Sequence, residues 1–296
     1  MDFLRPASWA EALAARAERP DAVPIAGGTD VMVELNFDRH RPGALIDLNR
    51  IPALRQWSRD ADGTIRLGAS VPYTRIIDEL RTELPGLAMA SRTVGSPQIR
   101  NRGGVGGNLG AASPAGDTHP ALVATDAVIE VESAARGVRT IPSTEFYLGV
   151  KRNALAADEL IKAVLLAPAK GPQQFSKIGT RNAMVIAVCS FAVALDVGAR
   201  KVGAGIGSAA PTPRRAFEAE LFAADALPWD GRGDLDPRVA RRFGELVAAA
   251  AAPIDDVRGT AAYRRHALSV MARRTLTWAW AEHQSSQTET EETDQP

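Results

Sequence analysis

The sequence predicts an α+β protein with more than one domain. A chain of 296 residues, 45% of them hydrophobic and 24% charged, is long enough to bury two or three cores. Segments with the periodicity of strands and of helices are mixed, without the strict alternation of a doubly wound sheet. After Pro213 the chain becomes rich in Ala and Arg and predicts helices.

Capping residues, glycines and prolines, together with the periodicity of apolar residues, predict the individual elements. Ser8 predicts the N-cap of a helix over 8–18, in which Ala and Leu recur at helical spacing. Glycine, proline and alternating apolar residues predict the elements that follow. These are a strand, a glycine turn and a second apolar strand over 22–37, a strand within 43–51, a strand and then a helix beginning near Pro72 within 63–80, a hairpin with Gly137 near its turn over 124–142, a strand within 158–168, and two strands within 173–196.

Composition excludes several classes of protein. Acidic and basic residues number 35 each, so the chain has no net positive charge that would attract it to nucleic acid or to an anionic membrane. No apolar run is long enough for a membrane span, and no leader is recognisable, so we expect a cytoplasmic protein. Cys189 is the only cysteine, which excludes an internal disulfide or a four-thiolate metal site in the chain and predicts a buried, inert thiol. The acidic, polar tail is expected to be disordered.

The first of two glycine segments is "PIAGGTDV", residues 24–31. It lies between two apolar stretches, so Gly27 and Gly28 predict a tight turn whose consecutive N–H groups converge on an anion, with the Thr29 hydroxyl as a further donor. A plain hairpin or a bulge would also need such a glycine pair.

The second is "NRGGVGGNLGAASPAGD", residues 101–117. Its glycines at 103, 104, 106 and 107 predict a backbone edge without Cβ atoms, which a ligand can approach closely. Asp117 is either the N-cap of the next helix or an acceptor for ligand hydroxyl groups, because a carboxylate does not suit a phosphate.

Known phosphate motifs do not fit these segments. No Lys-Ser or Lys-Thr follows the glycines, as a P-loop requires, and G-x-G-x-x-G spacing is absent from both. Gly205, Gly207 and Ala210 satisfy a relaxed G-x-G-x-x-A, but Pro211 and Pro213 fall where its helix should continue. We therefore reject a Rossmann site there.

Together the two segments resemble the FAD-binding subunit of the xanthine dehydrogenase and carbon monoxide dehydrogenase family of molybdenum hydroxylases. The resemblance begins at "DFLRPAS", continues through "AGGTD", "GSPQIRNRGGVGGNLGAASPAGD" and "FSKIGTRNAMVIAVCSFAVALD", and ends with "DVRGTAAYRRHALSVMARRTL". It implies a two-subdomain FAD-binding fold of the PCMH/vanillyl-alcohol-oxidase type, with subdomains at 1–57 and 58–171. A C-terminal α+β domain with a small antiparallel sheet would follow at 172–281, and the tail at 282–296.

The resemblance also implies the site. The pyrophosphate of FAD would lie on the backbone of both glycine segments, with Asp117 on the polar side of the cofactor and Ile161 beside it. A cation at Lys177 would stabilise the reduced flavin. Without the resemblance, the residues themselves favour Ile161 as an ordinary core residue and Lys177 as a solvated strand residue. The implied residues are Pro24, Ile25, Ala26, Gly27, Gly28, Thr29, Asp30, Val31, Gly104, Val105, Gly106, Gly107, Asn108, Asp117, Ile161 and Lys177.

The function implied is electron transfer within an oxidoreductase complex. A molybdenum-cofactor large subunit would hydroxylate the substrate, a 2Fe–2S small subunit would pass electrons to the flavin, and NAD or another acceptor would take them. No histidine lies in either glycine segment, which predicts non-covalent FAD. No metal ligand set and no catalytic acid or base is assigned to the chain itself. Two alternatives stay open: a stand-alone flavin oxidoreductase of the same fold, and a bridging subunit without cofactor.

Overall fold

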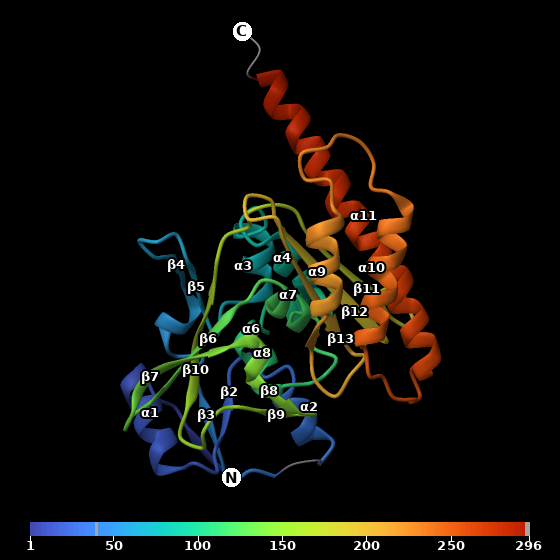
Figure 1. Ribbon diagram of the computed structural model, residues 1–296. Helices are drawn as coiled ribbons and strands as arrows, with labels where there is room; N and C mark the ends of the chain where they lie inside the picture. Colours follow the sequence, from blue (N-terminus) through green and yellow to red (C-terminus); the bar gives the residue numbers. More distant parts are fainter. Residues whose placement is uncertain (39–40, 294–296) are drawn as a thin grey trace. The chain divides into compact units, whose positions relative to one another are not determined.

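The computed structural model describes residues 1–38 and 41–293, and the chain forms two compact units that each draw on separate stretches of sequence (Figure 1). Unit 1 comprises 1–78, 94–113 and 126–168, and unit 2 comprises 79–93, 114–125 and the chain from 169 onward. The linear division into 1–57, 58–171, 172–281 and a tail stays a prediction.

Unit 1 is built on a parallel sheet and an antiparallel sheet. The parallel sheet has the order β1-β3-β2, with β1 (Asp2–Leu4), β3 (Ala44–Asp47) and β2 (Val23–Ile25). The antiparallel sheet has the order β4-β5-β10-β6-β7, with β4 (Trp57–Arg59), β5 (Ile65–Gly68), β10 (Leu160–Leu166), β6 (Val128–Ser133) and β7 (Gly137–Pro142). β8 (Tyr147–Gly149) and β9 (Arg152–Asn153) form a separate pair.

Short helices connect these strands. They are α1 (Trp9–Glu18), α2 (Val31–Asn36), the 3₁₀ helix η1 (Pro52–Arg55), α3 (Tyr73–Glu79), α5 (Pro97–Arg100), α6 (Val105–Ala111) and α8 (Ser143–Phe146). The predicted start of α1 is confirmed, because Oγ of Ser8 accepts a hydrogen bond from the Glu11 N–H. The hairpin is confirmed as well, with Gly137 in a left-handed conformation at φ 68°.

Unit 2 contains the antiparallel sheet expected for the C-terminal region. Its order is β11-β12-β13-β14, with β11 (Gln173–Ile178), β12 (Cys189–Asp196), β13 (Lys201–Gly207) and β14 (Arg214–Arg215). Its helices are α4 (Pro85–Arg92), α7 (His119–Ala124), α9 (Phe217–Ala226), α10 (Pro237–Ala250) and α11 (Ala261–Thr293), of which α10 and α11 run side by side (Figure 1).

The two faces of β13 are packed differently, as the alternation of a strand requires. Val202, Ala204 and Ile206 join the apolar core formed with α9, α10 and α11. The intervening glycines meet α7 instead: a Cβ at Gly205 would overlap the carbonyl oxygen of Pro120. The G-x-G pattern at Gly205 therefore serves close packing of a helix on a strand, in agreement with our rejection of a nucleotide site there.

Two expected elements differ from the structure. The apolar stretch after the first glycine pair is helix α2, not a second strand, since a short apolar run does not by itself distinguish the two periods. The tail is not disordered where the structure describes it, because α11 continues to Thr293. Gln284 and Gln287 accept hydrogen bonds from Gly233 and Arg232, which hold that part of the helix. Residues 294–296 lie outside the described part.

Among the described residues, no helix combines the length and the apolar character needed to cross a membrane.

Candidate cofactor-binding site

The two glycine segments lie against each other in unit 1. A Cβ at Gly27 would overlap the carbonyl oxygen of Arg102, and a Cβ at Gly103 would come 3.3 Å from Oγ1 of Thr29. Only residues without a side chain allow two backbones to approach this closely. The structure thus brings together two segments that are far apart in the sequence.

The first segment has the geometry of an anion-binding turn. Pro24 and Ile25 end strand β2, and Asp30 is the N-cap residue of α2, whose side chain makes no capping hydrogen bond. Gly28 between them has φ 75°, a conformation that favours glycine. The backbone N–H groups of 27–31 donate no recorded hydrogen bond within the described part of the chain. Unpaired N–H groups around a left-handed residue, leading into a helix, suit a negative charge.

The glycines of the second segment have different roles, which corrects the interpretation that all of them keep one edge open. Gly104 and Gly106 are packed against the connection after β5: a Cβ at Gly104 would lie 2.5 Å from the Val71 carbonyl oxygen, and one at Gly106 would overlap that of Ala69. Gly107 is exposed, and a Cβ there would meet no atom within 4 Å. Val105 is buried in the same helix, α6, and Asn108 is half-buried. Of the four glycines at 103, 104, 106 and 107, Gly107 is therefore the open one.

Asp117 and Lys177 form a buried ion pair in unit 2. The Lys177 ammonium nitrogen, Nζ, lies 2.6 Å from Oδ2 of Asp117 and 3.2 Å from the Thr93 carbonyl oxygen. Each side chain of the pair is 8% exposed. The N-cap of α7 is Thr118, so Asp117 does not cap that helix. Lys177 is not a solvated strand residue either.

This pair keeps hydrogen-bonding capacity for a ligand. Burial raises the pKa of Asp117 above its ordinary value, and the Lys177 charge and the Thr93 hydroxyl act in the opposite direction. Oδ1 of Asp117 is buried and has no hydrogen-bond partner among the described residues. An ammonium group carries three hydrogens, and Lys177 uses two in the recorded bonds. A buried carboxylate oxygen without a donor is costly, so a polar ligand at this position would stabilise it.

Ile161 lies on β10 at an irregular position of the sheet. Its side chain is 8% exposed, and the register with β6 shifts between Ile161 and Ala163. A bulge of this kind changes the direction in which neighbouring side chains point. Burial alone fits both the core and the cofactor interpretation of Ile161.

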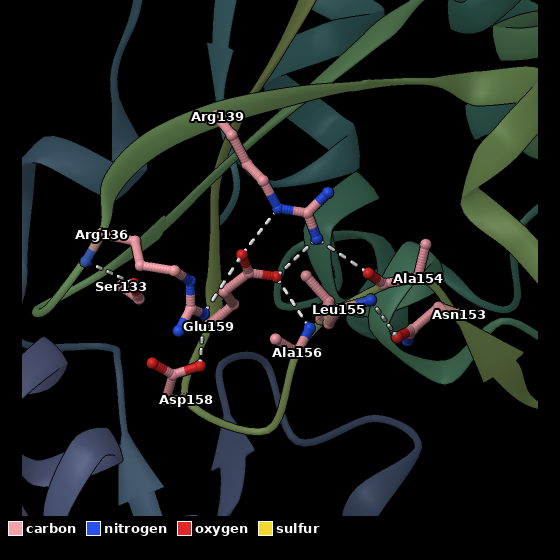
Figure 2. A network of polar contacts seen from close by, with 9 residues as sticks. All are labelled: Ser133, Arg136, Arg139, Asn153, Ala154, Leu155, Ala156, Asp158 and Glu159. Carbon is pink, nitrogen blue, oxygen red and sulfur yellow. Dashed lines mark hydrogen bonds and ion pairs between the residues drawn. The ribbon is translucent and has the colours of Figure 1, made fainter.

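An ion-pair network secures the start of β10, just before Ile161 (Figure 2). Glu159 accepts two hydrogen bonds from Arg139, both 2.7 Å, and one from the Ala156 N–H at 2.7 Å. Arg136 donates to Asp158 at 2.5 Å. The bond from Arg139 holds the pKa of Glu159 below its usual 4.5. The network therefore joins the β6–β7 hairpin to β10 through charged side chains.

Other candidate chemistry is not supported. Cys189 is fully buried, and burial raises the pKa of its thiol to about 12, which confirms an inert thiol. Within the part of the chain that the structure describes, no three His, Cys, Asp or Glu residues could jointly hold a metal ion.

Two residues that contribute to the site were not predicted from the sequence. Thr93 contacts both members of the ion pair, although it is separated from Lys177 by 84 positions. Arg102 contributes its carbonyl oxygen to the contact between the glycine segments. No local sequence pattern marks either residue as part of the site. Arg102 acts through its backbone carbonyl, and Thr93 acts on partners that are distant in sequence.

An α+β chain in which two glycine segments meet beside N–H groups without a recorded partner indicates a protein that binds an anionic ligand, and the comparisons identify its family. The family described as "FAD binding domain in molybdopterin dehydrogenase" matches residues 1–168, and "CO dehydrogenase flavoprotein C-terminal domain" matches 174–279. The chain belongs to this family of FAD-binding subunits of molybdenum hydroxylases, so it is an oxidoreductase subunit whose cofactor is FAD.

Individual relatives agree along nearly the whole length. The "Xanthine dehydrogenase FAD-binding subunit" of Escherichia coli O157:H7 is 30% identical over 288 residues, 94% of this chain and 96% of the relative. The "Nicotinate dehydrogenase FAD-subunit" of Eubacterium barkeri is 35% identical over 205 residues, 66% of this chain and 69% of the relative. Carbon monoxide dehydrogenase from Hydrogenophaga pseudoflava has a chain of 27% identity and TM-score 0.86, with 96% of this chain and 98% of that one covered. The predicted fold class and family are confirmed.

Proposed function

We propose that the chain binds FAD non-covalently and transfers electrons for a molybdenum hydroxylase. The observation that carries this proposal is the contact between the two glycine segments, where the N–H groups of 27–31 have no recorded partner among the described residues and a Cβ at Gly107 would meet no atom within 4 Å. A diphosphate needs converging donors and close backbone approach, and both are provided in unit 1.

The chain's own residues hold the cofactor. The pyrophosphate would bind to the N–H groups of 27–31 and to the open side of α6 at Gly107. Asp117 and Lys177 would supply an acceptor and a donor to its polar groups, and Ile161 an apolar contact. When bound, FAD supplies a carrier that takes up two electrons singly or together. We assign no acid or base of the chain to this transfer.

The partners follow from what the chain lacks and from its relatives. One cysteine cannot ligate an iron–sulfur cluster, so the 2Fe–2S centres would be in a small subunit and the molybdenum cofactor in a large one. Relatives are named as medium chains or subunits, which supports a role within a complex. NAD or another oxidant would accept the electrons.

An absorption spectrum of the purified chain tests the proposal first. We expect flavin bands that pass entirely into the supernatant after acid denaturation, with FAD and not FMN on chromatography. A colourless protein that stays colourless after incubation with FAD would overturn it. Expression with its own neighbouring subunits then separates the alternatives, since purification as a lone active flavoprotein would favour the stand-alone oxidoreductase.

A further inference from the structure

Thr93 contacts both members of the buried ion pair with different atoms. Its hydroxyl Oγ1 lies 3.0 Å from Oδ2 of Asp117, and its carbonyl oxygen accepts a hydrogen bond of 3.2 Å from Nζ of Lys177. The same hydroxyl lies 2.8 Å from the carbonyl oxygen of Ala90, so its one hydrogen is shared between two acceptors. All three residues of the contact belong to unit 2.

The position of Thr93 is set by helix α4. Thr93 is the C-cap residue, and its N–H bonds back to the carbonyl oxygens of Ala90 and Ser91. The carbonyl end of a helix carries partial negative charge, which favours a cation such as the Lys177 ammonium. Thr93 therefore places a helix end and a hydroxyl against the pair at the same time.

From these contacts we infer that Thr93 is a positioning residue for the cofactor, acting through Asp117. Oδ2 of Asp117 is occupied by Lys177 and Thr93, which leaves Oδ1, buried and without a partner among the described residues, as the acceptor for a ligand. Without the hydroxyl, rotation of the carboxylate is less restricted, and burial makes its charged form less favourable. The inference rests on the proposed function, in which Asp117 contacts FAD.

The test compares Thr93→Val, which removes the hydroxyl at nearly constant volume, with Thr93→Ser, which keeps it. FAD is titrated into the apoprotein of the full chain, and the positions of the bound flavin's visible bands are recorded. We expect Thr93→Val to raise the Kd for FAD by about three- to tenfold, the range for one hydrogen bond of ordinary strength, because the Thr93 hydrogen is shared between two acceptors, and to shift those bands. Thr93→Ser should restore both readouts.

Thr125 provides a matched control. It is the C-cap residue of α7, and its hydroxyl donates 2.8 Å to the carbonyl oxygen of Ala121, as Thr93 does to Ala90. Thr125→Val therefore removes the same local bond at the end of another helix of unit 2. Both Val variants should lower the melting temperature of the apoprotein, Thr93→Val by more because it also removes the bond to buried Asp117, whereas only Thr93→Val should weaken FAD binding.

A double-mutant cycle distinguishes action through Asp117 from a general structural effect. In an Asp117→Ala background, which leaves the Thr93 hydroxyl no side-chain acceptor at 117, Thr93→Val should change the Kd by less than about twofold. Equal effects in both backgrounds, or a Ser variant as weak as the Val variant, would overturn the inference while FAD binding by the wild type stands. If the wild type does not bind FAD, the proposed function fails, and the inference that rests on it fails as well.

Discussion

Replacing Gly107 by Asp should change protein stability and cofactor affinity in opposite directions. Gly107 is the third residue of α6, and a Cβ there meets nothing within 4 Å. A residue with a better helix propensity than Gly and a carboxylate in the first turn should each stabilise the apoprotein, together by about 0.5–1 kcal/mol. The variant is therefore expected to fold at least as well as the wild type.

The same carboxylate should weaken FAD binding strongly. A unit charge about 5 Å from another, at an effective dielectric constant of about 20, is repelled by about 3 kcal/mol. With one such interaction, the Kd for FAD rises by at least about a hundredfold, and the second phosphate adds to this. Gly107→Asn has nearly the same size without the charge, so its Kd should rise by much less.

Fluorescence titration of the apoprotein with FAD, in parallel with thermal melts, measures both quantities. Higher salt should narrow the difference in Kd between the Asp and Asn variants, because the repulsion is partly screened at an exposed position. Retention of wild-type affinity by a well-folded Asp variant would refute the placement of the pyrophosphate at Gly107. Equal losses in the Asp and Asn variants would show that bulk, not charge, is responsible.

Three further substitutions test the packing and the ion pairs. Gly106→Ala puts a methyl group onto the Ala69 carbonyl oxygen and should lower the free energy of unfolding by about 1–3 kcal/mol. Urea denaturation measures this change, and an unchanged midpoint would contradict the packing role of this glycine. Gly205→Ala should cost a similar amount through overlap with Pro120, and a variant as stable as the wild type would show that α7 can move away. Glu159 has a pKa below 4.5 in the folded chain, so the stability it contributes is present above about pH 4.5 and is lost as the pH falls through the lower folded value. Glu159→Gln should therefore be less stable at pH 7 and lose less stability on acidification, and unfolding curves that fall in parallel with those of the wild type would count against this network.

The elements with strong local signals were predictable. Ser8 as an N-cap and Gly137 at a hairpin turn depend on neighbouring residues alone, and the structure has both. Helix α2 carries no helical signal in the sequence, because its apolar residues are adjacent and none of its residues is buried, so no period of one buried face marks it.

The site was predictable in outline only. Two glycine segments in the right order indicate a cofactor family, but they do not say which glycine packs and which stays open. Gly106 and Gly107 are adjacent in sequence, but Gly106 is buried against Ala69 while Gly107 is exposed. The contact of Thr93 with Asp117 likewise depends on where α4 ends in space, which no local pattern encodes.

The glycines of β13 also have a consequence for how the protein can be altered. Gly203 and Gly205 let the main chain of α7 rest directly on the main chain of the strand. The shortest contacts between these two layers are therefore made by main-chain atoms of α7, the carbonyl oxygens of Pro120 and Ala124, although the Val123 side chain also lies close to Gly205. Asp117 comes just before that helix, so a change at Thr93 alters the electrostatic surroundings of Asp117 without touching the main-chain contacts that hold α7 on the strand.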